Sequence, residues 1–366
     1  MFFLIAALSA FLLWTVFNSF FLPSLPKTFT LPNSPLVSVL IPMRNEERNV
    51  ETLTSALKAA VYPNLEFIIL NDQSTDRTGV LLEQMTAGDS RFTVIGGKEL
   101  PPDWVGKVHA CHQLQKHAKG DYLLFIDADI RFSPEAIGQA LALMNERQAK
   151  LLSGFPAFDV PPFLSKLLVP MQHFVVLFHL PLVLANYANF PAATAANGMW
   201  MMFERKSYDA VGGHAAVRNS LVEDVHIARR FKASGHKMLL ANITKSVQCR
   251  MYDTNHDVWE GFLKNSYTGI GRSPVFAVAL ALFYSFFYIL PLFLALYGIS
   301  TNKLLFTVPY VLAVVQQAYV MACTRQHLHL ALLIPLQAAA MIAVLLQSMW
   351  KSWRKKPYTW KGRQYS

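Results

Sequence analysis

Long apolar segments at both ends of the chain constrain its fold more than any other feature. Residues 1–22 contain no charged side chain, and further apolar stretches cover residues 275–299, 304–323 and 328–350. A helix needs about 20 apolar residues to cross a hydrocarbon core ~30 Å thick. Each of these segments is long enough to span, so we expect a multi-pass protein of the cell membrane.

The first apolar segment is expected to be an uncleaved anchor. It lacks the cationic start of a signal peptide, and no clear small-residue cleavage site follows it. The first cationic residues after it are Lys27, Arg44 and Arg48, and the tail at residues 351–366 is also rich in Lys and Arg. Cationic residues are retained on the cytoplasmic side. The central domain and the tail are therefore both predicted to be cytoplasmic.

This orientation conflicts with three C-terminal crossings. An even number of crossings must separate two cytoplasmic segments, so one of the three stretches between residues 275 and 350 should lie in the membrane plane or re-enter. The stretch near Pro335 is a candidate, because proline frees a backbone carbonyl and can interrupt a span.

A further apolar segment, residues 163–187, is a poor candidate for a span. It is interrupted by Lys166, Pro170 and Pro181. A crossing here would also place the acidic residues before it and those after it on opposite sides of the membrane. We therefore predict interfacial helices over this segment.

Charge and cysteine content exclude other classes of protein. The formal net charge is +10, but the basic residues cluster near the apolar ends and do not alternate with aromatic residues. This pattern favours anionic lipid headgroups as the partner and argues against nucleic acid. The cysteines, Cys111, Cys249 and Cys323, are odd in number and widely spaced, which indicates neither a disulfide framework nor a structural zinc site.

The middle of the chain alternates between strand and helix patterns. Apolar runs predict strands at residues 36–41, 65–70 and 122–126, and helical spacing predicts helices at residues 45–60 and 80–85. This alternation indicates an α/β fold with a mostly parallel sheet, whose ligands bind at the carboxyl ends of the strands. Polar motifs at residues 71–76 and 127–129 follow two of these strands directly.

The acidic motifs suggest a specific chemistry. Asp127-Ala128-Asp129 can hold a divalent cation on a diphosphate, and Glu223-Asp224 can supply a general base. Alone, the first is more often a solvated strand end. The second could simply be the acidic first turn of a helix, where carboxylates favour the macrodipole. Their order and position at strand ends favour the catalytic interpretation.

Five motifs occur in the order found in a known enzyme family. They lie at residues 37–46, 71–76, 104–107, 127–129 and 223–224. Together they resemble the inverting family-two glycosyltransferases with the GT-A fold, over roughly residues 36–246. Three more motifs, at residues 197–203, 259–265 and 358–365, are most similar to the membrane glycosyltransferases of carotenoid pathways, such as those acting on diaponeurosporenoate or hydroxychlorobactene.

The resemblance implies a site for a nucleotide-sugar along the strand ends. Its binding residues would be Pro42, Arg44, Glu46, Asp72, Lys107 and Asp127. Asp72 would accept a hydrogen bond from the uracil N3–H, which favours a UDP-sugar. Lys107 would lie near the diphosphate, and Asp127 near the ribose or the sugar.

Metal and acceptor roles follow from the same resemblance. Asp129 would ligate Mg²⁺ or Mn²⁺, which neutralises the departing UDP. Asp224 would take the proton of an acceptor hydroxyl that attacks the anomeric carbon from the face opposite UDP. Glu223 and Gly198 would support the acceptor side. His214, which follows a Gly-Gly turn, is a further candidate for a diphosphate or acceptor contact.

The sequence thus predicts four regions: an anchor at 1–22, a catalytic domain at 36–265, membrane helices at 275–350 and the basic tail. No Gln-x-x-Arg-Trp motif follows residue 224, which favours a single transfer over polymerisation. The expected acceptor is a membrane lipid such as a carotenoid, with polyprenyl phosphate or diacylglycerol as the alternative. A non-catalytic protein that binds a nucleotide-sugar or exports a lipid is the alternative from another class.

Overall fold

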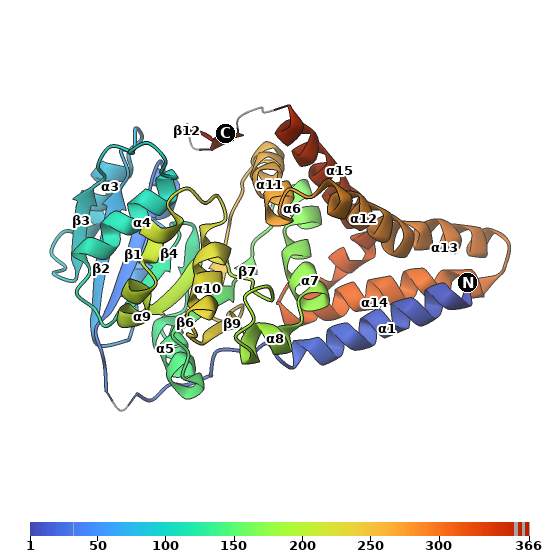
Figure 1. The fold of residues 1–366 in the computed structure, drawn as a ribbon, viewed down its shortest axis with the longest axis horizontal. Helices are drawn as coiled ribbons and strands as arrows, with labels where there is room; N and C mark the ends of the chain where they lie inside the picture. The colour runs from blue at the N-terminus through green and yellow to red at the C-terminus, as the bar shows by residue number, and fades with distance from the viewer. Residues whose placement is uncertain (32, 355–357, 361–362, 366) are drawn as a thin grey trace. The chain divides into compact units, whose positions relative to one another are not determined.

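The chain folds into two compact units, each of which combines distant parts of the sequence. The computed structural model describes all residues except 32, 355–357, 361–362 and 366, so part of the predicted tail lies outside the described residues. The helical unit comprises residues 1–21, 158–181 and 250–366, and the sheet unit comprises residues 22–157 and 182–249 (Figure 1).

A seven-stranded sheet forms the centre of the sheet unit. Its strand order is β3-β2-β1-β4-β8-β6-β9, and β8 alone runs antiparallel to its neighbours (Figure 1). The predicted α/β fold with a mostly parallel sheet is therefore confirmed. The strands are β1 (Val37–Met43), β2 (Leu65–Asn71), β3 (Phe92–Gly96), β4 (Tyr122–Ile126), β6 (Leu151–Phe155), β8 (Trp200–Glu204) and β9 (Met238–Asn242).

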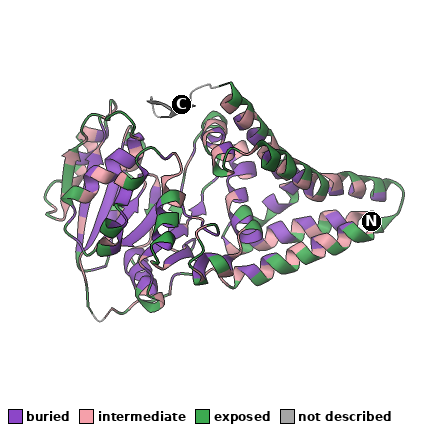
Figure 2. Cartoon of the chain, viewed as in Figure 1, coloured by how far each residue is buried: buried purple, intermediate pink, exposed green. Residues whose placement is uncertain are grey.

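Burial explains why these runs form the central strands. Most residues of the sheet's inner strands are buried (Figure 2), as expected for a parallel sheet covered by helices on both faces. The helix α2 (Glu47–Lys58) buries Val50, Leu53 and Leu57, which lie on one face at helical spacing. The other helices of this unit are α3 (Thr78–Thr86), α4 (Gly106–His117), α5 (Ala136–Arg147), α8 (Leu182–Tyr187), α9 (Arg205–Ala210), η1 (Gly213–Val217) and α10 (Glu223–Ala233).

One edge of this sheet gathers the turns that carry the acidic motifs. The parallel strands β1, β2 and β4 all end there, and the antiparallel β8 begins there. A smaller sheet continues from the same turns, with the order β5 (Ile130–Phe132), β10 (Val247–Cys249) and β7 (Ala157–Phe158). The sheet topology therefore places the two acidic motifs that follow β2 and β4 at one edge.

Among its described residues, the helical unit contains four helical segments that are long and apolar enough to cross a membrane. They are α1 (Phe2–Ser19), the run of α12 (Pro274–Tyr284), η2 (Ser285–Ile289) and α13 (Leu290–Ser300), the run of η3 (Leu304–Thr307) and α14 (Val308–Cys323), and the run of η4 (Leu328–Leu333) and α15 (Ile334–Trp353). They match the four apolar segments of the sequence. The short strands β11 (Tyr358–Trp360) and β12 (Arg363–Tyr365) follow in the tail.

One boundary between the compact units differs from the predicted end of the catalytic domain. The catalytic domain was expected to extend to residue 265, but the chain from Arg250 belongs to the helical unit. The reason is that α11 (Asn255–Gly269) packs on α15, where Trp259 Nε1 donates to Gln347 Oε1 at 2.8 Å.

The segment predicted as interfacial helices is divided between the units. It forms α6 (Phe163–Leu168), α7 (Pro170–His179) and α8, and its prolines start α7 and separate α7 from α8. The helices α6 and α7 belong to the helical unit and α8 to the sheet unit. An interfacial position for α6 and α7 stays a prediction.

Candidate active site

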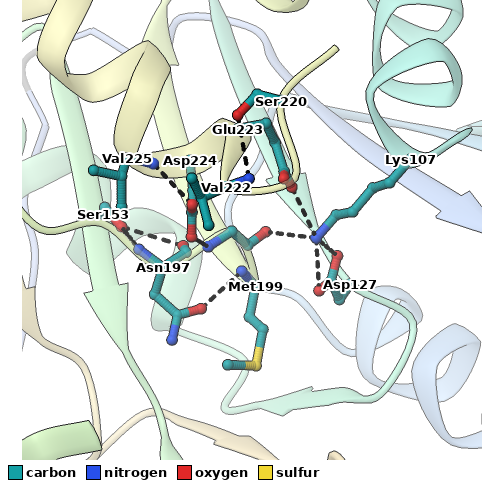
Figure 3. A network of polar contacts seen from close by, with 11 residues as sticks. Lys107, Asp127, Ser153, Asn197, Met199, Ser220, Val222, Glu223, Asp224 and Val225 are labelled. Carbon is teal, nitrogen blue, oxygen red and sulfur yellow. Dashed lines mark hydrogen bonds and ion pairs between the residues drawn. The ribbon is translucent and has the colours of Figure 1, made fainter. Parts of the chain in front are cut away.

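Three charged side chains from separate elements meet at the carboxyl edge of the sheet. Lys107 lies in the first turn of α4, Asp127 directly follows β4, and Glu223 begins α10. Lys107 Nζ lies 2.6 Å from Asp127 Oδ1, 2.8 Å from Asp127 Oδ2 and 3.7 Å from Glu223 Oε1 (Figure 3). The sequence analysis named these residues separately, and the structure brings them together in one ionic cluster.

This cluster fixes the charge of Lys107. Burial alone would lower the pKa of the ammonium, but the attraction of Asp127 and Glu223 outweighs it and raises the pKa above its ordinary value. Lys107 is therefore cationic throughout the physiological range. The Lys107 side chain is 35% exposed and the Asp127 side chain is 27% exposed, so solvent and an anionic ligand can reach the pair.

Asp224 is held next to this cluster by two backbone N–H groups. Gly198 N donates to Asp224 Oδ2 at 2.9 Å, and Val225 N donates to Asp224 Oδ1 at 2.8 Å (Figure 3). Burial and the neighbouring Glu223 raise the pKa of Asp224 to about 7, against the opposing effects of these hydrogen bonds and of Lys107. A carboxylate with such a pKa can accept a proton near neutral pH.

The turn before β8 links Asp224 to the cluster. Its residue Gly198 donates to Asp224, and its carbonyl oxygen lies 3.5 Å from Lys107 Nζ. Two further hydrogen bonds hold the turn in place: Asn197 N donates to Ser153 Oγ at 2.7 Å, and Met199 N donates to Asn197 Oδ1 at 2.9 Å. The sequence analysis assigned Gly198 a supporting role, named Asn197 only as part of the motif at residues 197–203, and missed Ser153, which no motif of charged residues would reveal.

Three of the predicted nucleotide-binding residues, Arg44, Glu46 and Asp72, follow β1 or β2 closely. Arg44 Nη1 donates to the carbonyl oxygens of Asp72 at 2.7 Å and of Gln73 at 3.4 Å. The backbone N–H of Asp72 donates to Met43 O at 2.7 Å, and Asp72 is only 5% exposed. Arg44 therefore holds the second turn against the end of the first strand.

Glu46 connects the same two turns. It is buried, its backbone N–H donates to Thr78 Oγ1 at 2.8 Å, and its carboxylate accepts from Asn49 Nδ2 at 2.6 Å. Pro42 lies in the last part of β1, where it pairs with Leu70 of β2. These contacts define the shape of the edge where a nucleotide would bind.

Asp129 lies beside a cysteine to which the sequence analysis gave no role. Cys249 of β10 pairs with Ile130 of β5, the residue after Asp129. Burial raises the pKa of Cys249 well above its ordinary value, and the neutral thiol hydrogen-bonds to Asp129. The partner strand of β5 thus supports the second carboxylate of the Asp-Ala-Asp motif.

The two aspartates of this motif fit a divalent cation only together with other ligands. Among the described residues, no three His, Cys, Asp or Glu side chains are grouped so that they could hold a metal ion. Carboxylate oxygens are suitable ligands for Mg²⁺, which proteins commonly hold with one or two carboxylates plus the phosphates of a substrate. Asp127 and Asp129 therefore fit a cation that arrives with a diphosphate.

His214 occupies the core of the sheet unit. Its Nδ1 lies 2.6 Å from the Tyr208 hydroxyl, and its ring packs 4.6 Å from that of Phe125. Burial, followed by the charge of Lys107, lowers the pKa of His214 to about 3, so the ring is neutral. These contacts indicate that His214 supports the fold, which corrects its predicted contact with diphosphate or acceptor.

Comparison with known proteins gives concordant matches. The sequence model of glycosyl transferase family 2 matches residues 38–222. The chain is 27% identical over 348 residues to the 4,4'-diaponeurosporenoate glycosyltransferase of Staphylococcus aureus strain MRSA252, covering 91% of this chain and 89% of the relative. The protein of the same name from strain N315 is 26% identical over 353 residues, covering 93% and 91%.

A solved structure shares the fold. The mannosyltransferase from Pyrobaculum calidifontis, solved in complex with GDP-Man and Mn²⁺, superposes with a TM-score of 0.56 and 15% sequence identity. The match covers 96% of this chain and 99% of that protein. At this identity the likeness concerns the fold alone.

Proposed function

Because the chain belongs to glycosyl transferase family 2 and is therefore a glycosyltransferase, we propose that it transfers one sugar from a UDP-sugar to a lipid in the membrane. The observation that carries the proposal is the Lys107–Asp127–Glu223 cluster next to Asp224, whose pKa is raised to about 7. An ammonium group that could bind a diphosphate and a carboxylate that could act as the base for an acceptor thus lie side by side.

The donor would bind along the turns after β1, β2 and β4. Asp72 is our candidate for accepting a hydrogen bond from the uracil N3–H, because it follows β2 at this edge of the sheet. Its low exposure suits a single hydrogen bond to the edge of a base. Pro42, Arg44 and Glu46 would shape the floor under the nucleotide. Lys107 would move from Asp127 toward the diphosphate when the donor binds, since its side chain is partly exposed.

Asp129, with Asp127 beside it, would hold the Mg²⁺ or Mn²⁺ that enters with the diphosphate. Such a cation would neutralise charge on the leaving UDP. The fit rests on hard carboxylate oxygens that directly follow β4, those of Asp127 being part of the Lys107 cluster. Lys107 would supply a second positive charge for the same leaving group.

Transfer would occur in one displacement. The acceptor oxygen forms a bond to the anomeric carbon while the bond to UDP breaks and UDP leaves with its electron pair. Asp224 would take the proton of an acceptor hydroxyl on the face opposite UDP, so the configuration at the anomeric carbon inverts. The two N–H groups that hold Asp224 orient its carboxylate for this step.

For the acceptor we propose a carotenoid-related lipid. The support is the name of the Staphylococcus aureus relatives, 4,4'-diaponeurosporenoate glycosyltransferase, together with the apolar helices that could reach a membrane. The ending -oate in diaponeurosporenoate, the word in the name of these relatives, denotes a carboxylate. Polyprenyl phosphate and diacylglycerol are the alternative acceptors, and the latter presents a hydroxyl.

The proposal is tested by UDP release from the purified full chain in detergent. The donor panel contains several UDP-sugars with GDP-mannose as a nucleotide control, each with and without Mn²⁺ and a membrane lipid extract. We expect turnover that needs a UDP-sugar, Mn²⁺ and the extract. Turnover with GDP-mannose alone would contradict the donor assignment, and no turnover with any donor would favour a binding or export protein.

Asp129→Asn is expected to remove the dependence on metal. We expect transfer to fall by about 10²-fold or more, because the amide replaces one of two charged ligands on the cation. Titration calorimetry supplies an independent readout: Mn²⁺ should tighten UDP binding to the wild type but not to Asp129→Asn. Asp121→Asn, at an exposed residue just before β4, is the matched control and should retain the Mn²⁺ effect.

Gly198→Ala is expected to lower kcat/KM for the donor by about 3- to 10-fold. An added Cβ would lie 3.2 Å from Lys107 Nζ and 3.4 Å from Glu223 Oε1, so Lys107 must shift while the backbone bond to Asp224 stays. Gly96→Ala is the control, because a Cβ there meets nothing within 4 Å. Equal effects of the two substitutions would contradict this role of Gly198.

A further inference from the structure

The helical unit contains an antiparallel hairpin of two apolar segments. The run from α12 to α13 ends at Ser300, and η3 and α14 return from Leu304. The turn is closed where Lys303 N donates to Gly298 O at 2.8 Å and where the Tyr297 and Phe306 rings lie 5.2 Å apart. The start of α12 and the end of α14 therefore lie on the same side of this hairpin, opposite to its turn.

The first helix, α1, runs parallel to α14. Gln316 Nε2 donates to Thr15 Oγ1 at 2.9 Å, and the Ser19 and Tyr319 hydroxyls lie 2.7 Å apart. The later residue of α1 contacts the later residue of α14, so the two helices run in the same direction and end on the same side. We call this side, where α1 and α14 end and α12 begins, the near side. The chain leaves α1 from the near side to enter the sheet unit.

The fourth apolar segment begins on the near side and turns back into the bundle. Its first part, η4, follows the end of α14 after a short loop. It then runs back along α14, because Tyr310 OH, in the first turn of α14, donates to Leu332 O at 2.8 Å. Tyr310 precedes the end of α14 by about 20 Å at 1.5 Å per residue. Leu332 therefore lies close to the start of α14 and well away from the near side.

The helix α15 then returns to the near side. Near its start, Gln337 Oε1 accepts from Gln317 Nε2 at 2.8 Å, halfway along α14. Farther along, Leu345 and Met349 pack with Ala277, in the first turn of α12. At its end, Lys351 Nζ lies 3.1 Å from both carboxylate oxygens of Glu260, on the helix that precedes α12.

We propose that the segment from Leu328 to Trp353 is a re-entrant hairpin, so that only α1, the α12–α13 run and the η3–α14 run cross the membrane. Its turn lies at Ile334 and Pro335, and proline at the start of α15 lacks the N–H that would otherwise need a partner there. Gln337 Nε2 donates to Leu330 O at 3.1 Å and satisfies backbone at this depth. The parity problem of the sequence is then resolved.

The partner of this hairpin is the hydrocarbon core of the bilayer. Near its turn, Leu332 and Leu336 are 57% and 49% exposed and would contact acyl chains. At the other end, Trp350 and Trp353 are exposed, and the Arg354 guanidinium lies 4.2 Å from the centre of the Trp350 ring. Tryptophan and arginine at a helix end are typical of the headgroup layer. The hairpin would hold Arg354 on the near side.

Cysteine labelling in sealed membrane vesicles of both orientations tests this proposal. The background is the full chain with Cys323→Ala, since Cys111 and Cys249 are buried. Single cysteines are introduced as His327→Cys before η4, Lys303→Cys at the turn of the α12–α14 hairpin, and Arg354→Cys after α15. Ser352→Cys repeats the last position in case Arg354→Cys does not fold.

A membrane-impermeant maleimide should label His327→Cys and Arg354→Cys from the same side, and Lys303→Cys from the other. Leu332→Cys should resist this reagent from both sides and react with a lipid-soluble maleimide. Labelling of His327→Cys and Arg354→Cys from opposite sides would show that α15 crosses, and labelling of Leu332→Cys by the impermeant reagent would exclude re-entry. None of these readings depends on transfer activity.

Discussion

Asp224→Asn is expected to lower the rate of transfer to a hydroxyl acceptor by about 10²- to 10⁴-fold, the range typical of a lost general base. The amide occupies nearly the same volume and can still accept from one of the two N–H groups that hold Asp224. UDP affinity and the melting temperature should therefore change little. A large loss of UDP affinity in the variant would contradict the assignment of Asp224 as the base.

The pH profile makes this prediction specific. Because burial and Glu223 raise the pKa of Asp224 to about 7, the wild-type rate on a hydroxyl acceptor should rise as pH increases through about 7, where the carboxyl loses its proton. In Asp224→Asn this acid limb should be absent. A carboxylate acceptor is already ionised near neutral pH, so with it Asp224→Asn should cost much less. Comparing both acceptor types separates the base from a structural role.

Lys107→Met is expected to lower kcat/KM for the donor by about 10²- to 10³-fold, as for loss of a group that stabilises charge in the transition state. The substitution also leaves Asp127 and Glu223 without the cation that joins them. Lys107→Arg should retain part of the activity, because it keeps the charge. Lys116→Met, exposed near the end of the same helix, is the matched control.

The same variant should shift the pH dependence. Lys107 lowers the pKa of Asp224, so its removal should raise that pKa further and move the acid limb to higher pH. Pure loss of folding would reduce the amount of active protein without moving the limb. An unchanged limb together with a wild-type KM for the donor would contradict the proposed role of Lys107.

Local patterns predicted three strands of the sheet unit well. The strand expected at 122–126 is β4 itself, and those expected at 36–41 and 65–70 differ from β1 and β2 by one or two residues at an end. Buried strands are continuous apolar runs bounded by polar turns, and this signal is local in sequence. The same holds for the four apolar segments of the helical unit.

Contacts between distant residues could not be predicted in this way. The motifs identified Lys107, Asp127 and Glu223, but nothing in their sequence neighbourhoods shows that one ammonium joins two carboxylates. Similarly, the link from Gly198 to Asp224 uses backbone atoms, which every residue has. The position of Cys249 beside Asp129 depends on the pairing of β5 with β10.

Division of the chain into units also depends on distant packing. The residues from Arg250 to 265 were assigned to the catalytic domain by their place in the sequence, but α11 packs on α15, about eighty residues later. The parity argument predicted that one of the three C-terminal stretches does not cross the membrane, but it did not say which one. Our proposal that residues 328–353 re-enter rests on the contacts of Leu332, Gln337 and Lys351 with their neighbours.

The central claim is that Asp224 and the Lys107 cluster transfer a sugar to a membrane lipid. The most direct measurement is the movement of radiolabel from a UDP-sugar into the organic phase of a lipid extract, with the purified wild type and Asp224→Asn side by side. We predict label in an extractable lipid with the wild type and, for a hydroxyl acceptor, almost none with the variant. Label that stays in water as free sugar, or wild-type transfer by the variant to a hydroxyl acceptor, would contradict the claim.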